Sequence, residues 1–268
     1  MRISFPLSGP RRAERDHRLR RCTGSALDRI FRQSYGSRIA ANAKLIRHGN
    51  LSLEYGEDFQ FYDSCDMSAS AQQIETLYLQ ETARYGVDNV ALLTPYRQKT
   101  ETGVNALNER LREKLNPQDG KKAGGCIQKA DISFGRQGHA DKKLRGHQHG
   151  DIGYITSVTR DDTDSVLTVD FGDGRIAEYD GSDLEMLDLA YASTIHKSQG
   201  SEYKSVIINL QCAHAVMLVR PLVYTAITRA KERVLIVGER RALCIAIKRT
   251  DTEQRGTMLS ARIKELIS

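Results

Sequence analysis

Hydrophobic residues recur every three or four positions in three stretches of the first half of the chain. This spacing is that of an amphipathic helix, and it predicts helices over residues 26–48, 68–85 and 103–115. Gly49 and Gly86 follow the first two as stop signals, and Ser68 or Ser70 is the expected cap of the second helix. Residues 90–93 form a continuous apolar run, which is typical of a strand buried on both faces.

From residue 151 onward the pattern changes to short alternating strands, and it later returns to the earlier rhythm. Strands are predicted at 154–158, 166–171 and 175–179, and the Gly-Asp-Gly turn at 172–174 joins the last two as a hairpin. After this all-β module, strands are predicted near 189–193, 205–210 and 233–237, with helices over 218–230 and 239–248. The simplest architecture is a parallel α/β domain interrupted by a β insertion.

The composition is that of a soluble globular protein. Hydrophobic residues make up 40% of the chain and charged residues 28%. No apolar run approaches the roughly 20 residues that a membrane span needs, so no membrane partner is expected. The cysteines lie far apart with no CxxC pair, which disfavours a thiolate zinc site and a disulfide scaffold and fits a reducing cytoplasm. They are Cys22, Cys65, Cys126, Cys212 and Cys244.

The positive charge of the chain is concentrated in two short segments. The net charge is +6, and residues 1–21 hold seven arginines against two acids, whereas residues 136–149 hold four basic residues against one acid. A basic surplus suggests a nucleic-acid partner. Three histidines also crowd the second segment, but we expect an incidental loop there rather than a zinc site. They are His139, His147 and His149.

Residues 191–203, YASTIHKSQGSEY, carry the densest candidate chemistry. Hydroxyl groups, cationic donors and a glycine follow a predicted strand, as a phosphate-binding loop requires. The alternative is a polar surface turn.

Two further segments combine an arginine with a possible phosphate-binding role. Residues 224–231 place Arg229 near the end of a helix, where it could reach a developing phosphate charge or merely compensate the helix dipole. Phe31 and Arg32 lie side by side in a segment that, taken alone, is only part of a helix.

In this order and spacing, the segments resemble the C-terminal half of superfamily 1 DNA helicases of the RecD-like group, including the UvrD-like helicase C-terminal region. LAYASTIHKSQGSEYKSVII and LVYTAITRAKERVLIVG match motifs V and VI of the family, and VALLTPYRQKTETGVNALNERLREKLNP is similar to its motif IV region. IFRQSYGSRIAANAKLIRHG resembles the start of the second RecA-like domain, and GDIGYI through DFGDGRIAEY resembles a small inserted β-barrel. The resemblance implies an α/β fold, a RecA-like parallel sheet domain with a small inserted β-barrel.

The resemblance also implies a division of the chain. The expected parts are a disordered basic arm at 1–24, the first part of the second RecA-like domain at 25–120, an irregular loop at 121–149, the inserted β-barrel at 150–187, the rest of the domain at 188–248 and a tail at 249–268. When plausible codons for the arm and the loop are read in another frame, both segments come to resemble family motifs. We therefore interpret both segments as translated out of frame.

For the nucleotide, the family implies roles for five residues. Phe31 would stack on the adenine, Arg32 would reach the γ-phosphate, and Arg229 would be the arginine finger. Gly200 and Glu202 would lie near the phosphates and the ribose.

For single-stranded DNA, the family implies another five. Thr194 and His196 would hold its phosphates, and Gln199 would link the DNA site to the nucleotide site. Thr94 and Pro95 end a strand whose following loop would also meet DNA. Such contacts are independent of sequence and sensitive to salt.

The implied function is that of the C-terminal motor domain of an ATP-dependent helicase, moving 5′ to 3′ on single-stranded DNA in recombination, repair or conjugative transfer. ATP and Mg²⁺ need a GxxxxGK[ST] loop, which this sequence does not contain, so we expect activity only with an N-terminal RecA-like half as partner. Two alternatives stay open. One is a non-catalytic module that binds single-stranded DNA or docks on a helicase, and the other is a non-functional, frame-disrupted fragment.

Overall fold

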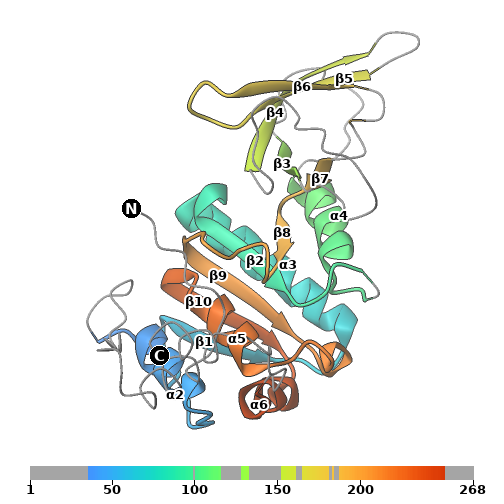
Figure 1. Cartoon of the computed structure of the whole chain (residues 1–268). Helices are drawn as coiled ribbons and strands as arrows, with labels where there is room; N and C mark the ends of the chain where they lie inside the picture. The colour runs from blue at the N-terminus through green and yellow to red at the C-terminus, as the bar shows by residue number, and fades with distance from the viewer. Residues whose placement is uncertain are drawn as a thin grey trace, which may run out of the picture.

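Five parallel strands form the central sheet of the main domain (Figure 1). In the computed structural model, residues 36–98, 100–115, 128–132, 152–160, 165–180, 183 and 187–250 are described. The strand order is β1-β10-β9-β2-β8, and every neighbouring pair is parallel. The strands are β1 (Phe59–Asp63), β2 (Val90–Thr94), β8 (Ala192–Thr194), β9 (Tyr203–Leu210) and β10 (Ala230–Gly238).

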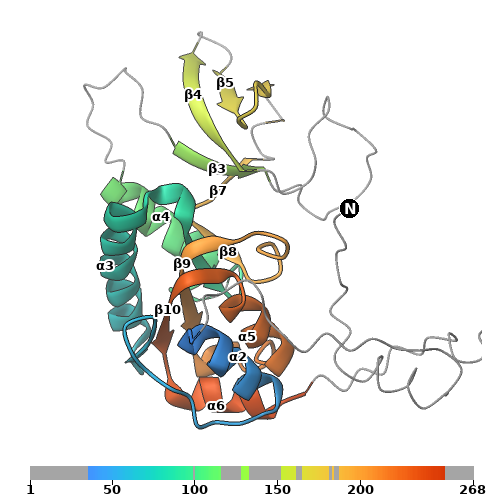
Figure 2. The same cartoon turned by 90° about the vertical axis from the view of Figure 1, so that its left-hand side faces the viewer.

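Helices cover both faces of this sheet, which explains why its central strands are apolar on both sides. One face packs against α2 (Arg38–Arg47), α5 (Arg220–Ile227) and α6 (Arg240–Lys248). The other face packs against α3 (Met67–Tyr85) and α4 (Val104–Leu115), and Figure 2 shows the two layers on either side of the strands. Short 3-10 turns, η1 (Val87–Asn89) and η3 (Cys212–His214), complete the domain. The expected parallel α/β domain is confirmed.

A second, antiparallel sheet with the order β6-β5-β4-β3-β7 lies beyond the β8 edge (Figure 1). Its strands are β3 (Gln128–Ile132), β4 (Ile152–Arg160), β5 (Ser165–Asp170), β6 (Ile176–Asp180) and β7 (Leu187–Leu189). Its small core is formed by Val169, Phe171 and Tyr179. Within the described residues β6 and β7 are the two ends of an open sheet, so the closed β-barrel expected over 150–187 is not what these strands form.

The sequence pattern located most elements, with informative exceptions. The predicted helices over 68–85 and 103–115 are α3 and α4, although Asp66 rather than a serine caps α3 by accepting from the Ala69 N–H at 2.7 Å. Strand β1 was not predicted, and β3 lies where an irregular loop was expected over 121–149. Both are five-residue strands of mixed polarity whose pairing partners are distant in sequence.

Several sequence-based expectations concern residues outside the described part of the chain. These are the basic arm at 1–24, most of the 121–149 segment with its three histidines, and the tail beyond residue 250. No helix in the described part is both long and apolar enough to cross a membrane.

Gly238, at the end of β10, is the position where the backbone most strictly excludes a side chain. Its φ is 141°, and a Cβ atom there would lie 1.9 Å from the carbonyl oxygen of Leu210 on β9.

We expect Gly238→Ala to lower the free energy of unfolding by about 3 kcal/mol through strain and overpacking. Gly86→Ala is the matched control, because Gly86 also has a positive φ of 82° but has no atom within 4 Å of the added Cβ. It should cost about 1 kcal/mol. Urea unfolding of both variants tests this, and equal losses would contradict the packing argument.

Candidate nucleic-acid and nucleotide site

The pairing of β2 with β8 places two candidate segments at one edge of the parallel sheet. Leu92, Leu93 and Thr94 lie opposite Ala192, Ser193 and Thr194 in parallel register. Parallel strands end at the same edge, so the loop after β2 and the turn after β8 emerge side by side. The Ile195 N–H donates to the Thr94 carbonyl at 3.2 Å and extends this contact past the strand end.

Thr94 and Pro95 shape the loop after β2 from the inside. Both are buried. The Thr94 hydroxyl donates to the Thr102 carbonyl at 3.1 Å and accepts from the Asn209 amide at 3.3 Å, and the same Asn209 amide also donates to the Thr102 carbonyl at 3.0 Å. These two residues therefore position the loop, and their side chains are not offered to a ligand.

The turn after β8 has buried anchors and exposed polar groups. The Lys197 N–H donates to the Thr194 carbonyl at 3.0 Å, and the buried Ser198 hydroxyl donates to the Ile195 carbonyl at 2.8 Å. Gly200, with φ of 91°, then lets the chain turn into β9. The exposed side chains of the turn are those of His196, Lys197 and Gln199.

Arg229 fastens the end of this turn to α5. Its guanidinium donates to the Ser201 carbonyl at 3.1 Å, the Thr225 carbonyl at 3.2 Å and the Thr228 hydroxyl at 3.4 Å. Nearby, Glu202 forms an ion pair with Lys231 at 3.0 Å. The turn after β8 thus holds five of the predicted site residues, and Arg229 is bonded to the end of that turn through Ser201. The five are Thr194, His196, Gln199, Gly200 and Glu202. Phe31 and Arg32 lie outside the described residues.

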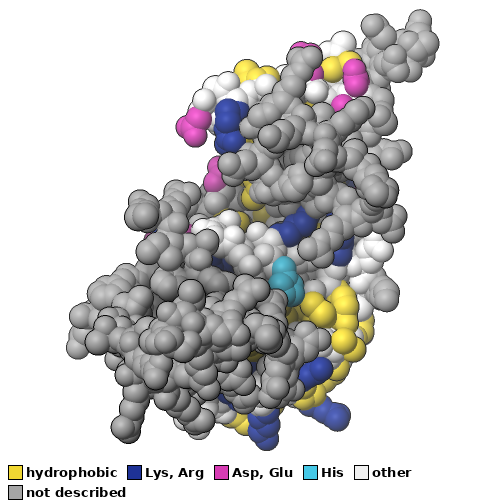
Figure 3. Space-filling view, viewed as in Figure 1, with side chains coloured by type: hydrophobic (Ala, Val, Ile, Leu, Met, Phe, Trp, Pro, Cys, Tyr) yellow, Lys and Arg dark blue, Asp and Glu magenta, His cyan; other side chains and the backbone are white. Residues whose placement is uncertain are grey.

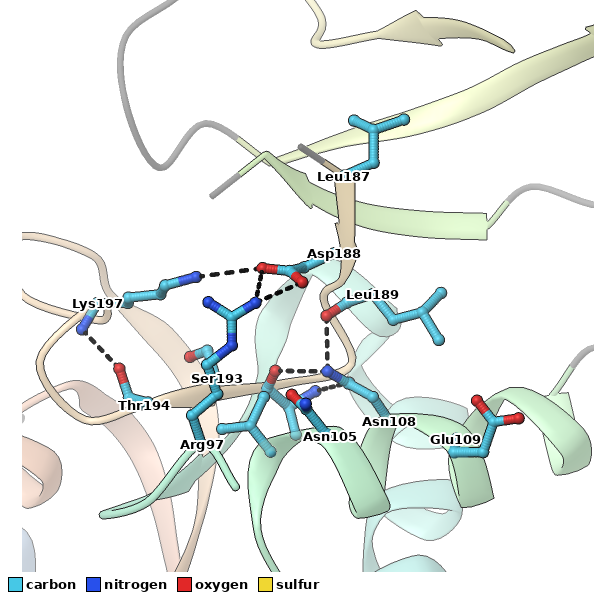
Figure 4. Close-up of a pocket in the computed structure, with 12 residues that line it drawn as sticks. Arg97, Asn105, Asn108, Glu109, Leu187, Asp188, Leu189, Ser193, Thr194 and Lys197 are labelled. Atoms are coloured by element: carbon cyan, nitrogen blue, oxygen red, sulfur yellow. Dashed lines mark hydrogen bonds and ion pairs between the residues drawn. The ribbon is translucent and has the colours of Figure 1, made fainter. Parts of the chain in front are cut away.

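A cavity of about 210 Å³ lies between the turn, α4 and β7 (Figure 4). Two cations and one carboxylate face one another there. Nη2 of Arg97 is 2.6 Å from both carboxylate oxygens of Asp188, and Nζ of Lys197 is 3.9 Å from one of them. The sequence pattern singles out none of the three, although Arg97 lies two residues after Pro95 and Lys197 lies inside the predicted phosphate loop.

Asn108 of α4 fixes the bend between β7 and β8. Its amide nitrogen donates to the carbonyls of Leu189 at 2.6 Å and Ala192 at 3.2 Å, and its carbonyl accepts from the Ala192 N–H at 2.7 Å. Because Asn108 is buried, these bonds hold the chain directly behind Asp188 in one place. No motif signalled this residue.

His214 ties the loop after β9 to the loop after β2. It is fully buried, its Nδ1 accepts from the Gln211 N–H at 3.4 Å, and its Nε2 lies 3.5 Å from the Thr100 hydroxyl. Burial lowers the pKa of His214 to about 4, against the opposing effect of the Glu239 carboxylate. The ring is therefore neutral at pH 7 and serves as a structural clamp.

The described part of the chain shows no cluster of candidate metal ligands. There, no group of three or more His, Cys, Asp or Glu side chains is arranged to hold an ion, and Cys65, Cys212 and Cys244 are free thiols.

Comparison with known proteins agrees with the geometry. Residues 189–237, which include the turn and Arg229, match the family model of the UvrD-like helicase C-terminal domain. The chain is 33% identical over 240 residues to the ATP-dependent RecD2 DNA helicase of Deinococcus radiodurans, covering 89% of this chain and 32% of the relative. These matches support a RecD-like superfamily 1 helicase C-terminal region.

Two further matches have lower sequence identity. The RecD subunit of the RecBCD enzyme from Mycobacterium tuberculosis is 27% identical over 248 residues, covering 83% of this chain and 40% of the relative. A solved structure of two coordinating Pif1 helicases at forked double-stranded DNA has a TM-score of 0.49 at 16% identity, over 88% of this chain and 54% of that chain. The helicase region thus spans about a third of RecD2 and two fifths of RecD.

The buried, neutral His214 predicts a specific dependence of stability on pH. An unfolded histidine titrates near 6.5, so between that pH and about 4 the unfolded chain binds more protons than the folded chain, and stability falls as the pH falls. From pH 7 to pH 5 this group alone should remove about 2 kcal/mol from the free energy of unfolding. His214→Asn, which can still accept from the Gln211 N–H, should show that much less loss, whereas His196→Asn at an exposed site should behave like the parent chain. Denaturant unfolding at both pH values decides, and a parallel loss in all three proteins would contradict the argument.

Proposed function

We propose that this chain is the second RecA-like motor domain of an ATP-dependent DNA helicase, which moves 5′ to 3′ on single-stranded DNA in recombination, repair or conjugative transfer. Two relatives, named as an ATP-dependent RecD2 DNA helicase and a RecBCD subunit, support this assignment. Because the chain spans about a third of RecD2, we assign unwinding to a larger assembly. This domain would contribute a DNA-binding surface and residues that contact the nucleotide.

The hydrogen bond between Arg229 and Ser201 is the main observation that supports this proposal. At one end of the turn, Thr194 and Lys197 line the cavity beside β7, and at the other end the Ser201 carbonyl accepts from Arg229 at 3.1 Å. A short, tightly hydrogen-bonded turn thus joins the candidate DNA contacts to the candidate arginine finger. If Arg229 leaves Ser201 for a phosphate, the turn loses a tether and its exposed side chains can shift.

The exposed side of the turn suits a sugar–phosphate backbone. His196 and Gln199 offer donors that fit any base sequence, and Arg97 and Lys197 add positive charge beside them. Figure 3 shows Lys and Arg side chains and a His side chain gathered on this face, at the level between the two sheets. Binding there would weaken steeply with salt, because each neutralised phosphate releases counterions.

The nucleotide side is suited to only part of an ATP site. Arg229 donates to the Thr225 and Ser201 carbonyls and to the Thr228 hydroxyl, and a phosphate would offer it charge-assisted hydrogen bonds, which are stronger. Gly200 and Glu202 adjoin it and would face the phosphates and the ribose. We assign ATP and Mg²⁺ to a site shared with an N-terminal RecA-like half that carries the GxxxxGK[ST] loop. Phe31 and Arg32 remain predicted contacts of the adenine and the γ-phosphate.

A second candidate function is a module that binds single-stranded DNA without catalysis, because the exposed His196, Lys197 and Gln199 side chains would serve it equally well. Both candidates predict DNA binding by the chain. They differ in whether the chain, mixed with the polypeptide encoded directly upstream, supports DNA-stimulated ATP hydrolysis.

Variants of the turn and of Arg229 test the proposed function. His196→Ala/Gln199→Ala should weaken binding of a labelled oligo(dT) about thirtyfold, since each of the two lost hydrogen bonds costs about 1 kcal/mol. The exposed pair His48→Ala/Gln80→Ala, of the same residue types, is the control and should bind like the parent chain. Arg229→Gln should retain DNA binding but lower the ATPase rate of the mixture by about 10³-fold.

Each outcome of this experiment has one meaning. DNA binding without any ATPase in the mixture would favour the non-catalytic module. A chain that neither binds oligo(dT) nor unfolds cooperatively would be a non-functional fragment.

A further inference from the structure

Asp188 holds two cations that belong to a different part of the fold. It lies on β7 of the antiparallel sheet, whereas Arg97 follows β2 and Lys197 lies in the turn after β8. The Arg97 and Lys197 side chains retain 38% and 33% of their exposure, and that of Asp188 retains 30%, so the cluster is open to solvent and to a ligand. Figure 4 shows the three side chains pointing toward one another among the residues that line the cavity.

The Arg97 guanidinium leaves binding capacity unused. One nitrogen, Nη2 of Arg97, contacts both carboxylate oxygens, and the other guanidinium nitrogens make no hydrogen bond to any residue that the structure describes. Nζ of Lys197 lies 3.9 Å from one oxygen of the same carboxylate and adds a second positive charge beside it. Beside them, the Thr194 hydroxyl and the cavity of about 210 Å³ provide a further polar group and space.

We propose that Asp188 takes the place of a DNA phosphate in the free chain, and that single-stranded DNA binding transfers Arg97 and Lys197 from Asp188 to a phosphate. This inference rests on the proposed function, because it needs DNA at this edge of the sheet. It adds two phosphate-binding residues and one internal competitor to the residues expected from the sequence.

Exchanging the Asp188 carboxylate for a DNA phosphate costs the two cations little free energy. A carboxylate and a phosphate present similar pairs of oxygen atoms to a guanidinium, so the geometry of Arg97 already suits the incoming group. An ion pair this exposed adds little net stability, whereas moving both cations to DNA releases condensed counterions. The backbone behind Asp188 stays in place during the exchange, since Asn108 holds Leu189 and Ala192 independently.

A consequence follows for the two sheets. The Arg97–Asp188 and Lys197–Asp188 pairs join the parallel domain to β7, and a second contact, from Tyr154 of β4 to Asp88, joins the sheets elsewhere. DNA binding thus removes the ion pairs, whereas the Tyr154–Asp88 contact and the hydrogen bond from Asn108 to the Leu189 carbonyl remain. Strand β7 then stays anchored at Leu189 and gains freedom at Asp188.

The test compares Asp188→Asn with a matched charge change in the same cavity. Glu109 also lines the cavity, but it pairs with Arg112 on its own helix. With the full 268-residue chain and fluorescein-labelled oligo(dT), Asp188→Asn should bind about three- to tenfold tighter at low salt. Glu109→Gln should stay within about twofold of the parent chain, because it competes for neither cation.

The salt dependence provides a readout that does not depend on Asp188. Arg97→Gln and Lys197→Gln should each lower the slope of log affinity against log salt by about 0.7, the value for one phosphate contact on a single strand. Equal tightening by Asp188→Asn and Glu109→Gln would overturn the proposal in favour of a general charge effect. An unchanged slope in Arg97→Gln would overturn it in favour of a purely structural ion pair. If the parent chain does not bind oligo(dT), the proposed function itself fails, whereas normal parental binding with no gain from Asp188→Asn refutes this inference alone.

Discussion

The parallel pairing of β2 with β8 is the constraint on which the site depends. The ladder is short, with Leu92 to Thr94 opposite Ala192 to Thr194, and the whole antiparallel sheet lies between the two strands in the sequence. The chain must therefore leave the parallel domain, build a second sheet and return in register. Only that return brings the loop after β2, the turn after β8 and the Asp188 carboxylate together at one edge.

Two kinds of polar interaction have different roles at this edge of the sheet. Asn209, Asn108 and His214 are buried and fix backbone segments through hydrogen bonds that water cannot replace. The Arg97–Asp188 pair is partly exposed, so its partners can be exchanged at low cost. Such a division keeps the geometry of the surface constant while its charges remain available to a ligand. It also explains why Thr94, expected at a DNA contact, is part of the rigid support instead.

Sequence reasoning succeeded where the signal is local. Apolar periodicity located α3 and α4. The dense polar segment at 191–203 indicated the turn after β8, which lies within the residues 189–237 that match the family model. It failed where partners are distant in the sequence. Strands β1 and β3 have little pattern of their own and are strands because of their neighbours. The roles of Asn108 and Asp188 likewise exist only once β7 and β8 have closed onto the parallel domain.

Hydrogen–deuterium exchange of the full chain, with and without oligo(dT), shows whether DNA binds where the β2 and β8 ends meet. We expect slower exchange on DNA binding in residues 95–98 and 194–201, and faster exchange in β7 as its ion pairs to the parallel domain open. Protection confined to the β5–β6 hairpin or to α6, with no change at residues 194–201, would contradict it.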